Sequence, residues 1–140
     1  MARQLLSSSQ SRFLMTAKIL IVDDSTINNI LLQNYLETQG YDVLTALNGN
    51  EAIQLLEQQL VDIMLLDMMM PGLSGLDVLA ILEDKGIHVP TIIISAFINP
   101  QYKAEAKKMG ALEYMDKPLN LKGLLARIED ISQHFSYTIK

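Results

Sequence analysis

The sequence predicts an α/β fold: a doubly wound parallel sheet of five strands in a (βα)5 chain. From Lys18 onward, short apolar runs alternate with segments of helical periodicity. Three of the runs are nearly unbroken apolar stretches, as parallel strands covered on both faces require. The connections are too short for anything but right-handed crossovers onto one sheet. The predicted strands, in order, are Lys18–Val22, Tyr41–Ala46, Asp62–Asp67, Thr91–Ser95 and Ala111–Met115.

The predicted helices are bounded by residues that commonly begin or end helices. Gly40, Gly86 and Gly110 follow the first, third and fourth helices, at positions where the backbone often takes a positive φ. Asn99-Pro100 supplies an N-cap and a first-turn proline, and Asn120 can cap the last helix. The predicted helices are Thr26–Gln39, Asn50–Leu60, Gly75–Lys85, Pro100–Met109 and Leu121–Phe135.

The first 17 residues differ from the rest of the chain. They hold three consecutive serines and show neither a sustained period nor the apolar block of a signal peptide. We therefore expect a disordered tail over residues 1–17 and a single domain over residues 18–140.

Composition excludes several classes of function. The 140 residues are 49% apolar, enough for one core, and contain 16 acidic against 11 basic residues. The resulting formal charge of −5 lacks the basic field that direct binding to nucleic acids or anionic membranes needs. With no cysteine and only two histidines, a disulfide framework, a thiol nucleophile and a multi-histidine metal site are also excluded. We expect a cytoplasmic protein.

Polar side chains stand where the predicted strands end. Asp23-Asp24 follows the first strand, Asp67 ends the third, Ser95 ends the fourth and Asp116-Lys117 follows the fifth. Because parallel strands all end at the same edge of a sheet, these groups should converge there. Clustered carboxylates repel one another, and a hard divalent cation such as Mg²⁺ relieves that repulsion.

Within such a cluster, Asp67 is a candidate nucleophile that attacks phosphorus to give an aspartyl-phosphate. Lys117 and Mg²⁺ would neutralise the oxygens of the transferring group. Each residue alone has a simpler explanation: Asp23-Asp24 as helix-capping acids, Asp67 as a turn residue, Ser95 as a strand-end hydroxyl and Lys117 as a surface lysine. Their joint placement at one edge favours the functional interpretation.

Taken together, these motifs resemble the receiver domain of two-component response regulators, from Lys18 to about Gln133. The matching residues are the acidic pair Asp23-Asp24, Asp67 before the Met70-Pro71-Gly72 turn, Ser95-Ala96, Tyr114, Lys117-Pro118, and Ala46-Leu47-Asn48-Gly49 with Glu51-Ala52. The resemblance implies the flavodoxin-like strand order 2-1-3-4-5, a doubly wound arrangement in which ligands bind at the carboxyl ends of the strands.

It also implies roles for single residues. Asp67 would be the phosphoacceptor, and Mg²⁺ would be bound by Asp24, by Asp67 and by the backbone carbonyl of Met69, with Asp23 acting through water.

In the phosphorylated state Lys117 would pair with the phosphoryl oxygens. Ser95 would turn toward them with Tyr114 following, and the small Ala96 would leave access open. The Lys117-Pro118 bond would be cis.

By this resemblance the chain is a signalling switch rather than an enzyme, assisting only its own phosphorylation and dephosphorylation. The phosphoryl donor would be a histidine kinase or a phosphotransfer protein. Phosphorylation would change the surface of the fourth helix, fifth strand and fifth helix, to which a downstream protein or a second copy would dock. Since no output domain follows the last predicted helix, we expect a stand-alone receiver domain or a phosphorelay intermediate.

Two other functions remain as alternatives. A haloacid-dehalogenase-like phosphohydrolase needs a second acid two residues after its nucleophile, where this chain has Ser25 after Asp23 and Met69 after Asp67. A phosphorylation-independent interaction module would not need the acidic cluster. We further hypothesise that Met69 and Phe97 hinder the attacking water and slow dephosphorylation.

Overall fold

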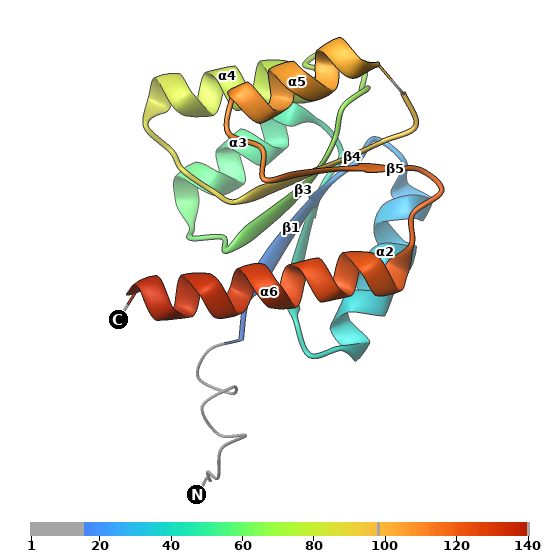
Figure 1. The fold of residues 1–140 in the computed structure, drawn as a ribbon, viewed down its shortest axis with the longest axis vertical. Helices are drawn as coiled ribbons and strands as arrows, with labels where there is room; N and C mark the ends of the chain where they lie inside the picture. The colour runs from blue at the N-terminus through green and yellow to red at the C-terminus, as the bar shows by residue number, and fades with distance from the viewer. Residues whose placement is uncertain (1–15, 98, 140) are drawn as a thin grey trace, which may run out of the picture.

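The computed structural model of the chain describes residues 16–97 and 99–139, with side chains as far as residue 133. The tail expected over residues 1–17 therefore falls almost entirely outside the described residues. In the described part of the chain, five parallel strands form one sheet in the order β2-β1-β3-β4-β5, which confirms the predicted fold (Figure 1).

Strands and helices alternate along the chain. The strands are β1 (Lys18–Val22), β2 (Asp42–Ala46), β3 (Ile63–Asp67), β4 (Thr91–Ser95) and β5 (Glu113–Asp116). The helices are α2 (Thr26–Thr38), α3 (Gly49–Gln58), α4 (Gly75–Lys85), α5 (Pro100–Lys108) and α6 (Leu121–Ile139).

The helices cover both faces of the sheet: α2 and α6 lie on one face, and α3, α4 and α5 lie on the other (Figure 1). Successive side chains of a strand point to opposite faces, so Leu20 and Val22 pack in one core and Ile19 and Ile21 in the other. This double coverage explains why the inner residues of β1, β3 and β4 are all apolar, with polar residues only at the strand ends.

Helix and strand ends differ from the sequence prediction in a few places. The last strand begins at Glu113 rather than Ala111, because the Ala111 N–H closes the end of α5 by donating to the Ala106 carbonyl at 2.9 Å. The second predicted helix begins one residue early, because Asn48 is its N-cap and accepts from the Glu51 N–H. The last helix extends to Ile139.

The predicted helix-terminal signals are otherwise confirmed. Gly40, Gly86 and Gly110 have φ values of 95°, 70° and 104°. Asn99 accepts from two N–H groups of the first turn of α5, and the Asn120 side chain accepts from the Gly123 N–H at 3.0 Å. Within the described residues, none of the helices combines the length and the apolar character that crossing a membrane would require.

Candidate functional site

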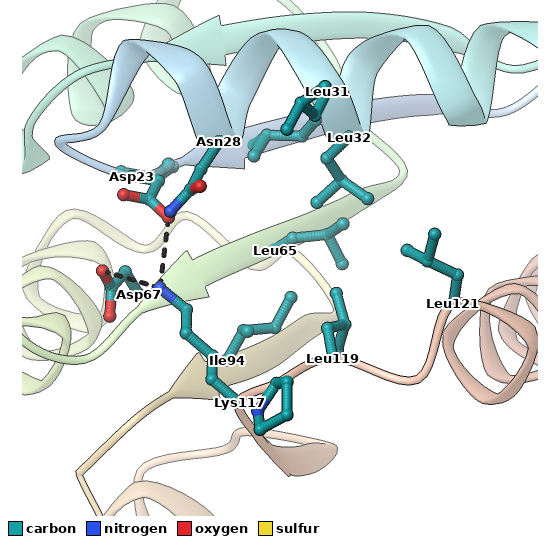
Figure 2. A pocket seen from close by; sticks show the side chains of 13 residues that line it. Asp23, Asn28, Leu31, Leu32, Leu65, Asp67, Ile94, Lys117, Leu119 and Leu121 are labelled. Atoms are coloured by element: carbon teal, nitrogen blue, oxygen red, sulfur yellow. Dashed lines mark hydrogen bonds and ion pairs between the residues drawn. The ribbon is translucent and has the colours of Figure 1, made fainter.

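The carboxyl edge of the sheet brings together the charged residues that follow β1, β3 and β5. Lys117 Nζ lies 3.3 Å from Asp23 Oδ2 and 3.6 Å from Asp67 Oδ2 (Figure 2). The backbone places these groups: the Asp23 N–H donates to the Ala46 carbonyl of β2, and the Lys117 N–H donates to the Ser95 carbonyl of β4. A lysine that is distant in the sequence thus lies directly against two aspartates.

Asp24 completes a cluster of three carboxylates. One oxygen from each of Asp23, Asp24 and Asp67 lies within 4.8 Å of the other two. Asp23 and Asp67 are buried, and Asp24 is exposed. Oxygen donors at this spacing, with one of them open to solvent, fit a hard divalent cation that keeps part of its water shell.

Local hydrogen bonds orient the two buried aspartates. Asp23 Oδ1 accepts from the Ser25 N–H at 2.9 Å, and Ser25 is the N-cap of α2. Asp67 Oδ1 accepts from the Met69 N–H at 3.2 Å. Each carboxylate is therefore held by the turn that follows its own strand, which leaves its other oxygen facing Lys117.

The charge on Asp67 is only partly compensated. Burial raises the pKa of the Asp67 carboxyl above its usual range, and the neighbouring Asp23 charge raises that pKa further. Lys117 and the hydrogen bond from the Met69 N–H act in the opposite direction. Because the net shift of the Asp67 pKa is upward, an additional positive charge at the site would stabilise the ionised form of Asp67.

Ser95 and Tyr114, the two predicted switch residues, both bond the backbone of Phe97. The buried Ser95 hydroxyl accepts from the Phe97 N–H at 3.0 Å, and the Tyr114 hydroxyl donates to the Phe97 carbonyl at 2.9 Å. The Lys103 ammonium lies 5.6 Å from the centre of the Tyr114 ring, within the range of a cation–π contact. These contacts connect the end of β4 with α5 and β5.

Met69 and Phe97 are partly exposed, at 51% and 37%. Each lies two residues beyond a site residue, Asp67 or Ser95, and the Phe97 ring packs against Tyr102 with ring centres 5.3 Å apart. Ala96 is exposed between Ser95 and Phe97. The peptide bond between Lys117 and Pro118 is cis, as expected.

Two residues that support the site were not assigned this role from the sequence. The buried Asn29 amide donates to the Asp23 and Ala46 carbonyls, at 3.0 and 3.3 Å, and so joins the ends of β1 and β2. A Cβ atom on Gly75 would lie 3.0 Å from the Asp67 carbonyl oxygen and 3.0 Å from Met68 Cα. In the sequence, the only sign of the role of Asn29 is a polar residue within a predicted helix. The only sign of the role of Gly75 is a glycine that follows the predicted turn.

Comparisons with known proteins agree with this geometry. The sequence model of the family described as response regulator receiver domain matches residues 19–129. The alkaline phosphatase synthesis transcriptional regulatory protein PhoP of Bacillus subtilis is 37% identical over 117 residues, which cover 84% of this chain and 49% of PhoP. The response regulator PleD of Caulobacter vibrioides is 35% identical over 121 residues, covering 85% of this chain and 27% of PleD. The chain thus spans about half of one curated relative and about a quarter of the other.

Solved structures of response regulators also resemble this chain in fold. A Francisella response regulator receiver domain superposes with a TM-score of 0.81 at 31% identity, covering 86% of this chain and 99% of that one. The response regulator TrrA of Thermotoga maritima, solved in complex with Mg²⁺ and BeF, superposes with a TM-score of 0.73 at 31% identity and covers 83% of this chain and 99% of that one.

Proposed function

Because this chain belongs to the response regulator receiver domain family, we propose that it is a phosphoacceptor switch in which Asp67 takes a phosphoryl group from a phosphohistidine. Receiver domains are signalling modules of two-component systems rather than classical enzymes. The donor would be a histidine kinase or a phosphotransfer protein. The observation that carries the proposal is Lys117, which contacts Asp23 and Asp67 inside a cluster of three carboxylates.

The carboxylate cluster supports Mg²⁺ as the cofactor. Asp24, Asp67 and the backbone carbonyl of Met69 would bind the ion directly, and Asp23 would act through water. When bound, Mg²⁺ supplies positive charge that offsets both the carboxylates and the oxygens of an incoming phosphoryl group.

The transfer itself is a nucleophilic displacement at phosphorus. A carboxylate oxygen of Asp67 attacks, so that a P–O bond forms while the P–N bond to the donor histidine breaks, and the imidazole leaves with the electron pair. Lys117 compensates the charge on the phosphoryl oxygens, because its ammonium already lies beside Asp67. Burial of Asp67 keeps most bulk water from the acceptor.

The switch would follow from the hydrogen bonds that the oxygens of the added phosphoryl group can accept. The Ser95 hydroxyl now accepts from the Phe97 N–H, and its own proton can be donated to a phosphoryl oxygen. Charge-assisted hydrogen bonds contribute about 1.5–3 kcal/mol each. Two of them approach the roughly 5.5 kcal/mol that moves an equilibrium from 1:99 to 99:1. Through the Phe97 backbone and Tyr114, this change would reach the surface of α5, β5 and α6, where a downstream protein or a second copy would dock.

Intact-mass analysis after incubation with Mg²⁺ and acetyl phosphate tests the proposal. We expect a single phosphoryl adduct that disappears in Asp67→Asn and when Mg²⁺ is removed. Asp84→Asn is the matched control, since it removes an exposed carboxylate on α4 away from the site and should leave the adduct intact. An adduct that survives Asp67→Asn would contradict the assignment.

The two alternative functions have distinct signatures. Turnover of p-nitrophenyl phosphate would indicate a phosphohydrolase, but Met69 occupies the position where such an enzyme needs its second acid. Partner binding that is unchanged by Asp67→Asn would indicate a phosphorylation-independent module.

A further inference from the structure

An apolar groove leads away from the phosphoacceptor between α2 and the segment that joins β5 to α6. It is continuous with the site, because Asp23, Asp67 and Lys117 line one end (Figure 2). The remainder is lined mostly by aliphatic side chains, among them Ile21, Leu31, Leu32, Leu65, Ile94, Leu119 and Leu121. The charged end holds two carboxylates and one ammonium, so with the proposed Mg²⁺ bound it would accept a phosphoryl group, while the apolar channel would accept a hydrocarbon chain attached to that group.

The walls of the groove come from different elements. Leu31 and Leu32 project from α2 on one side, Leu119 and Leu121 lie on the other, and Leu65 of β3 lies between them (Figure 2). Leu65 is almost fully buried, whereas Leu31 and Leu121 are 63% and 40% exposed at the rim. A molecule in the groove would therefore cover apolar surface that now faces water.

The size of the groove selects among occupants. It encloses about 290 Å³, close to the lower end of the roughly 300–1,000 Å³ of small-molecule pockets. A partner helix, about 10 Å across with its side chains, could rest on the rims but could not enter the groove. A short aliphatic chain matches the groove in volume and in polarity.

We propose that this groove accepts the acyl chain of an acyl phosphate, so that Asp67 takes its phosphoryl group from donors of four to eight carbons in preference to acetyl phosphate. This inference rests on the proposed phosphoacceptor role of Asp67. The chain would lie in the groove while the phosphoryl group stays beside Lys117, at the charged end.

This placement suits the chemistry of transfer. A chain that runs from the site into the groove would point away from Asp67, the direction in which in-line displacement requires the leaving oxygen to lie. The new P–O bond to Asp67 forms as the P–O bond to the acyl group breaks. The acyl group leaves as a carboxylate with the electron pair, so no proton transfer is needed.

The expected preference follows from burial of methylene groups. Each buried CH₂ is worth about 0.8 kcal/mol, or about fourfold in a rate constant that depends on binding. Hexanoyl phosphate has four more methylenes than acetyl phosphate. Because the groove is open on one side, these methylenes would be only partly buried, and we expect a gain in the rate constant of about tenfold in total rather than fourfold for each methylene.

The experiment measures the second-order rate constant of adduct formation with acetyl and hexanoyl phosphate by intact mass, in Mg²⁺. Each rate constant is divided by that for phosphoryl transfer from the same donor to free imidazole, which removes differences in intrinsic reactivity. We expect a normalised hexanoyl-to-acetyl ratio of about ten in the unmodified protein. The double variant Leu31→Gln plus Leu121→Gln should bring the ratio close to one.

Ile27→Gln is the matched control. Ile27 is 69% exposed on the same helix and lies outside the groove lining, so this variant should keep the high ratio. Leu31 and Leu121 are both exposed enough for polar replacements to leave the fold intact, which circular dichroism can check.

Three results would overturn the inference. A normalised ratio near one in the unmodified protein, with normal phosphorylation by acetyl phosphate, leaves the proposed function standing and removes the groove's role. A high ratio that persists in the double variant shows that the chain binds elsewhere. No adduct with either donor is a different failure, because it removes the phosphoacceptor role itself.

Discussion

At the scale of single residues, the surroundings of Asp67 disfavour the ionised form of its carboxyl group. It is buried beside Asp23, and the Lys117 ammonium and the Met69 N–H only partly offset the cost of ionisation. The folded protein therefore holds the proton on Asp67 more tightly than the unfolded chain does. A group with a raised pKa in the folded state adds stability at low pH and loses that contribution as the pH rises through the folded-state pKa.

We therefore predict that Asp67→Asn raises the melting temperature in metal-free solution at pH 7. A gain of about 1 kcal/mol would correspond to a rise of about 4 °C in a domain of this size. Lowering the pH protonates Asp67 and should narrow the difference between the two proteins. Mg²⁺ should stabilise the unmodified protein more than the variant.

Differential scanning calorimetry at several pH values, with EDTA or with Mg²⁺, checks this prediction. Asp84→Asn is the control for loss of an exposed carboxylate and should show no such pH-dependent gain. A lower melting temperature for Asp67→Asn in EDTA at pH 7 would contradict the electrostatic account of the site.

Met69 and Phe97 bear on the lifetime of the phosphorylated state. Both are large apolar side chains, partly exposed, close along the chain to Asp67 and Ser95. We predict that Met69→Asn and Phe97→Ala each speed the loss of the phosphoryl group several-fold, because a smaller or polar side chain gives the attacking water a better approach. Decay of the adduct after removal of the donor, followed by intact mass, measures the rate. Leu60→Ala is the control, since Leu60 is 92% exposed beyond the end of α3.

At the scale of elements, the start of α4 is pressed against the end of β3. The Gly75 N–H donates to the Met68 carbonyl at 2.8 Å, and a Cβ atom on Gly75 would lie 3.0 Å from the Asp67 carbonyl oxygen, closer than an ordinary contact. We predict that Gly75→Ala costs about 1–3 kcal/mol of unfolding free energy, the usual cost of forced packing, and slows phosphorylation by moving the acceptor turn. Urea denaturation and the adduct assay measure the two effects.

Gly123→Ala is the matched control for that substitution. A Cβ atom on Gly123 would meet its nearest neighbour at 3.5 Å, an ordinary contact, within helix α6. Alanine should therefore be neutral there or stabilising by up to about 1 kcal/mol, because it lowers the entropic cost of the helix. Equal losses in both variants would show that the close approach at Gly75 is unimportant.

The strand-end residues could be predicted from the sequence because the geometry of parallel sheets is general. Any polar residue that ends a buried parallel strand lies at the same edge, which is why Asp23, Asp67 and Lys117 could be placed together. The family resemblance then supplied the strand order, which the alternation of elements alone leaves open.

Other features depend on tertiary contacts that no local pattern encodes. The start of β5 was predicted two residues early because Ala111 is apolar, although its N–H is used to close α5. Phe97 was predicted only to add bulk, because its backbone bonds to Ser95 and Tyr114 depend on how the ends of β4 and β5 approach each other. Asn29 is polar but buried, and only its two carbonyl partners explain it.

At the scale of the whole molecule, the proposed signal starts on one edge of the sheet and is received on one side of the domain. The contacts that join Ser95, Phe97, Tyr114 and Lys103 run from β4 to β5 and α5. Arg127 of α6 extends this connection by bonding Glu113 of β5 at 2.9 Å. The helix α3 lies on the sheet without any of these contacts among the described residues.

We predict that beryllofluoride with Mg²⁺, a mimic of the phosphoryl group, changes amide hydrogen exchange in α5 and β5 and leaves α3 unchanged. Hydrogen-exchange mass spectrometry of peptides covering these elements provides the measurement, with Asp67→Asn as the control that should abolish the response. Equal changes in α3 and α5 would mean that the ligand tightens the whole domain rather than one surface.

The two hydrogen bonds at Phe97 have one last consequence. Ser95 binds the N–H of this residue and Tyr114 binds its carbonyl, so the backbone groups on either side of one Cα atom are both held. Because only the φ and ψ torsions of Phe97 separate these two groups, a movement of Ser95 toward a phosphoryl group would be passed to Tyr114 by rotation at this single residue.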